Sequence, residues 1–164
     1  MNHWTQLTLT RRVFPNVWNA VEHRTPGYGI NDYDLFYFDP TDLSYEAEDR
    51  ALQRARLVFA DLDALIDLKN QARVHLWYSD RFGAYYPPTA HAQEAIGRFQ
   101  IRCTCIGLQP HADGTLALHA PYGTDELARG ELVFNRNCPS LDGAAAKAAS
   151  YQARWPWLKI VSVD

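Results

Sequence analysis

Asp32 and Asp34 are the residues of this chain whose type and spacing point most directly to chemistry. They lie in an aromatic-rich run over 32–38, which predicts a β-strand that ends at the turn signal Asp39-Pro40. Residues i and i+2 of a strand point to the same face, so the two carboxylates converge. Two like charges so close call for a cation, and Mg²⁺ prefers oxygen ligands. The pair therefore predicts a metal site, the alternative being that Asp32 only caps the turn after 27–29.

Asp67 is a candidate third carboxylate. It lies in the short apolar segment Leu65 to Leu68, which also reads as a strand. If this strand lies beside the first, Asp67 completes a three-carboxylate site. Such a site can hold one or two metal ions that bridge a triphosphate and activate an attacking hydroxyl. The alternative is a solvated acid at the edge of a short strand.

A second group of polar side chains lies in the segment 70–77. Arg73 can bind a phosphate bidentately, and Asn70 and Gln71 can hydrogen-bond a base or a sugar edge. His75 could act as a general base or a metal ligand. The alternatives are a packed histidine with satisfied ring nitrogens and, for Arg73, an ion pair within the protein.

The elements that must position these residues follow from periodicity. A helix is predicted over 45–60, with Ser44 as N-cap and acidic residues in its first turn. The segment 70–82 alternates like a strand but also fits one helix face, and we favour a helix. The other predicted elements are a helix opened by Pro15, a helix over 89–99, paired strands at 102–108 and 115–119, a short helix from Thr124, a helix over 142–154 and a strand over 158–163. Strands interleaved with helices predict an α/β or α+β fold.

Length and composition bound the class of protein. The chain has 164 residues, of which 47% are hydrophobic, and this suits one domain over 1–164. No apolar run is long enough to span a bilayer, and the N-terminus does not read as a secretory signal. The formal net charge of −3 argues against nucleic acid as a partner. Three cysteines make no disulfide framework. We therefore expect a reduced, cytoplasmic protein without structural zinc, with Cys103 and Cys105 on one strand face.

Several strings of this sequence resemble one known family. They are Val17-Trp18-Asn19, the run 27–35, the run 42–49 and the string Asn-Gln-Ala-Arg-Val-His-Leu-Trp at 70–77. Together they are similar to a bacterial family of small nucleotidyltransferase-like proteins, and the similarity extends from about Val17 to the C-terminal Trp-Pro segment. The string at 70–77 is specific, whereas an Asp-x-Asp pair alone is not.

The resemblance implies a small mixed sheet packed with helices. It also implies that Asp32 and Asp34 are the metal-binding pair and that Asp67 is the third carboxylate. The implied reaction moves a nucleoside monophosphate from a nucleoside triphosphate to a hydroxyl with Mg²⁺ (or Mn²⁺). The acceptor is not implied.

One departure from that family concerns the phosphate turn. Nucleotidyltransferases have a Gly-Ser or Gly-Ala turn before the helix that precedes the Asp-x-Asp strand, because only small residues let the backbone approach the phosphates. This chain has Arg11 and Arg12 there, and no glycine before Gly27. Their guanidinium groups could contact the phosphates directly. The alternative is a catalytically degenerate module that binds a nucleotide or a protein.

Overall fold

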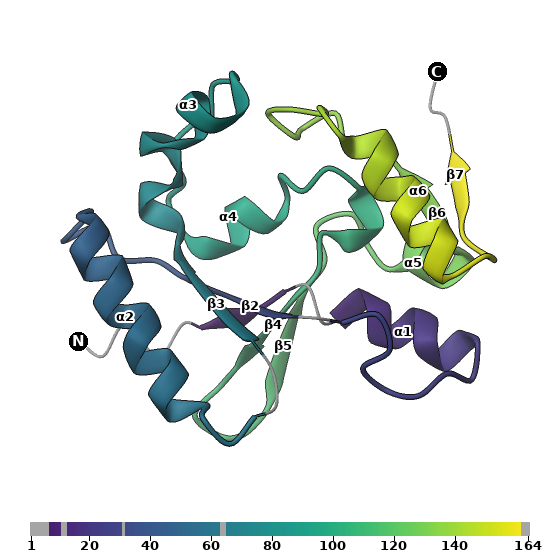
Figure 1. Cartoon of the computed structure of the whole chain (residues 1–164), viewed down its shortest axis with the longest axis horizontal. Helices are drawn as coiled ribbons and strands as arrows, with labels where there is room; N and C mark the ends of the chain where they lie inside the picture. The colour runs from purple at the N-terminus through teal and green to yellow at the C-terminus, as the bar shows by residue number, and fades with distance from the viewer. Residues whose placement is uncertain (1–6, 11–12, 31, 63–64, 162–164) are drawn as a thin grey trace.

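A five-stranded mixed sheet forms one half of the molecule (Figure 1). The computed structural model describes residues 7–10, 13–30, 32–62 and 65–161. The strand order is β3-β2-β1-β4-β5, and the neighbours are antiparallel except for the parallel pair β2 and β3. The strands are β1 (Thr8–Leu9), β2 (Asp32–Tyr37), β3 (Leu65–Asn70), β4 (Gly107–Pro110) and β5 (Leu116–His119).

Helix α2 (Tyr45–Val58) connects β2 to β3 and covers one face of the sheet (Figure 1). It begins as predicted, since the Ser44 hydroxyl accepts a hydrogen bond from the Ala47 amide, 3.2 Å away. Its buried Ala55 packs against apolar side chains of both strands, namely Leu35, Tyr37, Ile66 and Leu68. Because side chains alternate along a strand, the intervening aspartates face the opposite side of the sheet.

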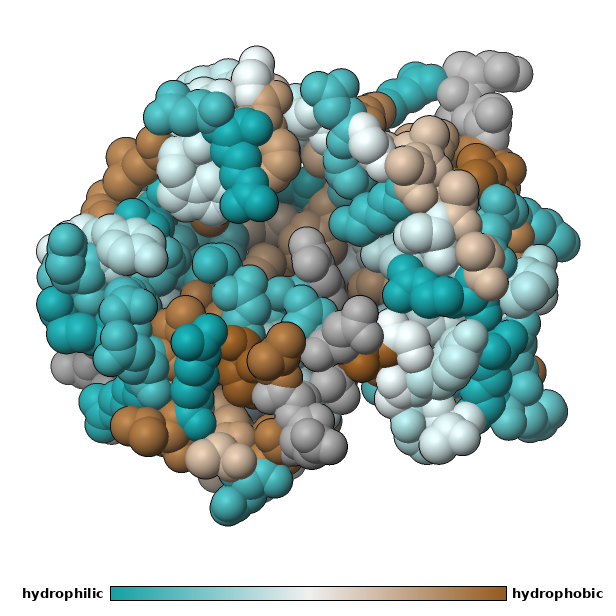
Figure 2. All heavy atoms as spheres, viewed as in Figure 1, coloured by the Kyte–Doolittle hydropathy of each residue, from teal (hydrophilic) through white to brown (hydrophobic). Residues whose placement is uncertain are grey.

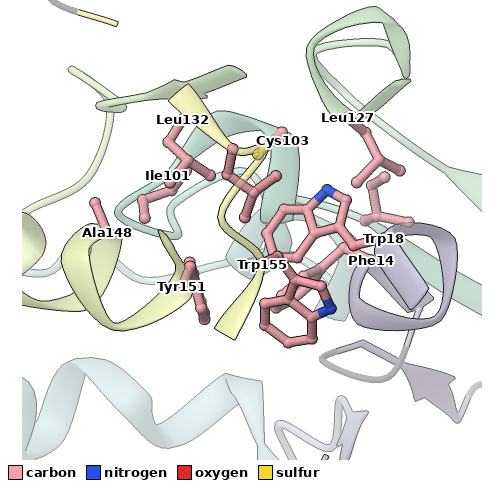
Figure 3. Packing of buried hydrophobic residues seen from close by; sticks show 11 residues of the cluster. Phe14, Trp18, Ile101, Cys103, Leu127, Leu132, Ala148, Tyr151 and Trp155 are labelled. Atoms are coloured by element: carbon pink, nitrogen blue, oxygen red, sulfur yellow. The ribbon is translucent and has the colours of Figure 1, made fainter. Parts of the chain in front are cut away.

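The other half of the molecule is built mainly on helices from both ends of the chain (Figure 1). Its elements are α1 (Val13–Val21), α5 (Asp125–Arg129), α6 (Ala144–Arg154) and the parallel strands β6 (Glu131–Val133) and β7 (Lys159–Val161). Helix α4 (Ala92–Ile96) instead lies against the sheet, where Ile96 packs at Gly107 and Thr8. Trp18 of α1 and Trp155 after α6 are fully buried in the core of this half, with ring centroids 5.2 Å apart (Figure 3). This core joins α1, which precedes the Asp-x-Asp strand, to the C-terminal segment.

The segment 70–82 is mainly helical, as we predicted, but it forms two short helices rather than one. Residues Gln71–Leu76 form a 3₁₀ helix, η2, and Tyr78–Phe82 form the short helix α3, which ends at Gly83. Gly83 has a φ of 65°, a left-handed conformation that is common directly after a helix.

The predicted strand over 102–108 is wrong in its first half. Arg102–Thr104 form a 3₁₀ turn, η3, in which the Thr104 hydroxyl bonds the Ile101 carbonyl, and Cys103 and Cys105 are buried rather than lying on a strand face. Strand β4 begins only at Gly107, where a Cβ would lie 2.6 Å from Ile96 and 2.7 Å from Thr8. Its antiparallel pairing with β5 is as predicted. All three cysteines are free thiols.

Candidate functional site

The three aspartates lie on one face of the parallel strand pair. Asp34 of β2 is the direct register partner of Asp67 of β3, and Asp32 precedes Asp34 on the same face. Asp34 is buried, with 4% of its surface exposed. The Asp67 carboxylate is 41% exposed and lies 3.2 Å from the Lys69 ammonium. The sheet therefore places the three predicted carboxylates on the same face, the side that α2 does not cover.

These residues fit a divalent cation in donor type, and they share one face of the sheet. Adjacent carboxylates on neighbouring strands are unfavourable without a counter-charge, and here the Lys69 ammonium supplies one to Asp67. Among the described residues, no three acidic, histidine or cysteine side chains gather closely enough to form a metal-binding group. Carboxylate oxygens are nevertheless the ligands that Mg²⁺ prefers. Asp32, Asp34 and Asp67 are thus the side chains that could hold it.

Thr10, which directly follows β1, lies against the backbone of Asp34. The Thr10 amide donates to the Asp34 carbonyl over 3.0 Å, and the Thr10 hydroxyl lies 3.4 Å from the same oxygen. Thr10 is completely buried. The sequence did not single it out, since no pattern distinguishes one threonine at the end of a short strand. Arg11 and Arg12, which were predicted to contact phosphate, lie outside the described residues.

Asn70 and Gln71 lie at the end of β3 and are almost fully buried. The Asn70 side chain makes two hydrogen bonds to the backbone of Asp39. Its oxygen accepts from the Asp39 amide at 3.0 Å, and its nitrogen donates to the Asp39 carbonyl at 2.9 Å. The same side-chain oxygen accepts from the Ala72 amide and caps η2. Gln71 donates to the Lys69 carbonyl over 3.4 Å. Asn70 therefore joins β3 to the loop after β2, and recognition of a base or sugar by either residue stays a prediction.

Arg73 makes an ion pair with Glu48 of α2, which is the alternative that the sequence left open. The two side chains are only 12% and 9% exposed. The Glu48 carboxylate also accepts a hydrogen bond of 2.8 Å from the backbone amide of Asn70. The Arg73 guanidinium donates to the Leu43 carbonyl over 3.3 Å. This pair lies on the α2 side, whereas the aspartates face the other side of the sheet. Phosphate binding by Arg73 stays a prediction.

His75 lies within η2 and is partly buried. Within the part of the chain that the structure describes, its buried Nδ1 atom makes no hydrogen bond. A role for His75 as a base or ligand stays a prediction.

A cavity of about 500 Å³ lies past the end of β3, between η2, α3 and the start of α2. Its lining is charged and aromatic: Tyr45, Glu48, Lys69, Arg73, Trp77, Asp80 and Arg81. The outer surface over α2 is mostly hydrophilic (Figure 2). Lys69 connects this cavity to the aspartate face, because its ammonium bonds Asp67.

Tyr37, the last residue of β2, has a pKa raised to about 12, chiefly because burial disfavours the phenolate and secondly because Glu48 is near. A raised pKa means that the folded state holds the proton more tightly, so this group loses its stabilising contribution as the pH rises from about 10 to about 12. In an absorbance titration of the phenolates, Tyr37→Phe should remove one high-pH transition and leave another from Tyr78, whose pKa is also about 12. Loss of a transition near pH 10 instead would contradict the burial of Tyr37.

The fold and the site together define a class of protein. A mixed sheet packed with helices, with a helix before the Asp-x-Asp strand, is the fold that the resemblance to nucleotidyltransferases implies. A solved structure described as a CCA-adding enzyme head domain superposes with a TM-score of 0.74, at 20% identity, over 96% of this chain and 82% of that one. This likeness confirms the predicted fold class.

The family follows from the sequence itself. Residues 10–160 match the family described as "Nucleotidyltransferase", so the chain belongs to that family, as the resemblance implied. A comparison with curated proteins finds no match. In the part of the chain that the structure describes, no helix is both long and apolar enough to cross a membrane.

Proposed function

We propose that this protein is a metal-dependent nucleotidyltransferase that moves a nucleoside monophosphate from a nucleoside triphosphate to a hydroxyl group. The observation that carries the proposal is the in-register placement of Asp34 beside Asp67, with Asp32 on the same face. Membership of the nucleotidyltransferase family supports it. Mg²⁺ or Mn²⁺ would supply Lewis-acid stabilisation of the phosphate charge when bound.

Each aspartate has a role in this proposal. Asp32, Asp34 and Asp67 would hold the cation, and the burial of Asp34 would strengthen its electrostatic interaction there. Asp67 orients the acceptor hydroxyl and takes its proton. The hydroxyl oxygen forms a bond to the α-phosphorus, the bond to the β-phosphate breaks, and pyrophosphate leaves. Lys69 pairs with Asp67 and would compete with a cation for this carboxylate.

A second candidate is a module that binds a nucleotide without catalysis. The turn before α1 favours it, because Thr10, Arg11 and Arg12 stand where nucleotidyltransferases have small residues. In this case the nucleotide would bind equally well with or without a divalent cation. The two functions therefore differ in their dependence on the metal.

Thermal melting of the full chain separates the two candidates. ATP, GTP, CTP and UTP are each added with and without Mg²⁺ or Mn²⁺. A triphosphate at 100 times its dissociation constant stabilises a protein by about 2.7 kcal/mol, a shift of about 5–10 °C for a domain of this size. The transferase predicts a shift that needs the cation and is lost in the Asp32→Ala/Asp34→Ala double variant. A shift without the cation supports the binding module, and no shift with any triphosphate contradicts both.

A further inference from the structure

The loop that leads into Asp32 is held by side chains of α1. Gly27 and Gly29 have φ values of 87° and 69°, in the left-handed region of backbone conformation that glycine adopts without steric cost. The Gly27 amide donates to the Asn16 side chain over 3.1 Å. The Asn19 amide group donates to the Tyr28 carbonyl over 3.0 Å. Two backbone groups of the loop are thus fixed by the helix that precedes it.

The same loop is held from the opposite end of the chain. The Arg154 guanidinium, at the end of α6, donates to the Gly29 carbonyl over 3.0 Å. The Trp155 ring lies so close to Gly29 that a Cβ there would meet it at 3.0 Å. The ring also packs edge-on against Tyr28, with centroids 6.1 Å apart. A Cβ at Gly29 would therefore require the Trp155 ring to shift by a few tenths of an ångström.

Trp155 also fixes the α1 residue that holds the loop. Its indole nitrogen donates to the Asn19 side-chain oxygen over 2.8 Å, and both residues are almost completely buried. Asn19 therefore accepts from Trp155 with one end and donates to Tyr28 with the other. Figure 3 shows Trp155 beside Trp18 of α1, deep in the core. The contacts connect residues 125 and 136 positions apart.

Asp32 and Asp34 depend on different parts of the structure. Asp34 lies inside β2, between the β3 ladder and the Thr10 amide. Asp32 is the first residue of β2 and pairs with Leu65 at the end of the β3 ladder, so the ladder supports it from one direction only and the loop 27–30 lies just before it in the chain. A metal ligand must be held within a fraction of an ångström, and this requires support from surrounding residues.

We propose that Arg154 and Trp155 are positioning residues that hold the 27–30 loop, and with it Asp32, in the geometry needed for the divalent cation. This inference rests on the proposed function. It assigns to the C-terminal Arg-Trp pair a role in the site on the sheet, from which it is remote in sequence. The reactive groups themselves are the aspartates, and the pair acts through the loop.

Two readouts test the proposal in the full chain. Hydrogen exchange reports the loop without any ligand, and Mn²⁺ binding, followed by the loss of the free-ion paramagnetic resonance signal, reports the site. Arg154→Ala should speed amide exchange in residues 28–30 at least severalfold. It should also raise the Mn²⁺ dissociation constant by about tenfold, the lower end of the effect of residues that orient metal ligands. Arg154→Lys, which keeps a cationic donor, should recover part of both effects.

Gln152→Ala is the matched control. Gln152 lies on the same helix and donates to the Leu158 carbonyl over 2.9 Å, a hydrogen bond that does not involve the loop. It should leave loop exchange and Mn²⁺ affinity as in the wild type. The proposal is overturned if Arg154→Ala and Gln152→Ala behave alike in either readout. A wild-type protein that binds no Mn²⁺ would overturn the proposed metal site itself, while loop exchange would still show whether Arg154 holds the loop.

Discussion

Asp34→Asn is expected to lower nucleotidyl transfer by on the order of 10³-fold and to leave the fold intact. Losing a ligand of the cation removes several kcal/mol of stabilisation from the transition state, and each 1.36 kcal/mol is tenfold in rate. Asparagine has nearly the shape of aspartate, so the buried position of Asp34 is filled as before. The substitution also removes a like-charge contact with Asp67 across the strand pair. The melting temperature should therefore stay within a few degrees of the wild type.

The measurement is pyrophosphate release from the triphosphate that gives the largest metal-dependent melting shift. Water serves as the acceptor until a better hydroxyl is found. Asp61→Asn is the matched control, because Asp61 is exposed in the turn after α2 and lies outside the site. It should leave the rate unchanged. Equal rates for Asp34→Asn and the wild type would remove Asp34 from the catalytic role.

The aspartate face was predictable because it depends on local patterns. The spacing of Asp32 and Asp34 fixes their common face once 32–38 is read as a strand. The helix over 45–58 is marked by Ser44 and by acids in its first turn, and it carries the chain back to a parallel neighbour. The pairing of the two strands and its register needed the structure, since a shift of one residue would have turned Asp67 to the α2 face.

The partners of the string at 70–77 could not be predicted in the same way. Glu48 lies 25 residues before Arg73, within a helix whose other acids are exposed or half-exposed, and no spacing marks it as buried. The link from Asn19 to Trp155 spans most of the chain. Both depend on how elements pack, and a single sequence carries no signal for that. The turn at 102–104 was not predicted for a related reason. Ile101, Cys103 and Cys105 alternate along the sequence like a strand, whereas the chain forms the 3₁₀ turn η3 there and buries all three.

Glu48→Ala is expected to destabilise the fold by about 3–5 kcal/mol, because it leaves a buried guanidinium without its counter-charge. Arg73 is only 12% exposed, so water replaces little of the lost interaction. The substitution also removes the acceptor of the Asn70 amide. Urea unfolding measures the loss, which is a large part of the 5–15 kcal/mol typical of a domain. A loss of stability below about 1 kcal/mol would contradict the prediction, because that is the contribution of a solvent-exposed salt bridge.

The double variant Glu48→Leu/Arg73→Met tests the pair and the predicted phosphate role of Arg73 together. Replacing both charges by apolar side chains of similar volume avoids an unpaired buried ion, so it should cost much less than either single substitution. A non-additivity of more than about 2 kcal/mol in the cycle would confirm the coupling. Because this variant should fold, its melting shift with triphosphate and Mn²⁺ can be read directly. We expect the shift to persist, since Arg73 lies on the α2 side and the aspartates on the other. Loss of the shift would show that Arg73 binds the phosphates despite its ion pair.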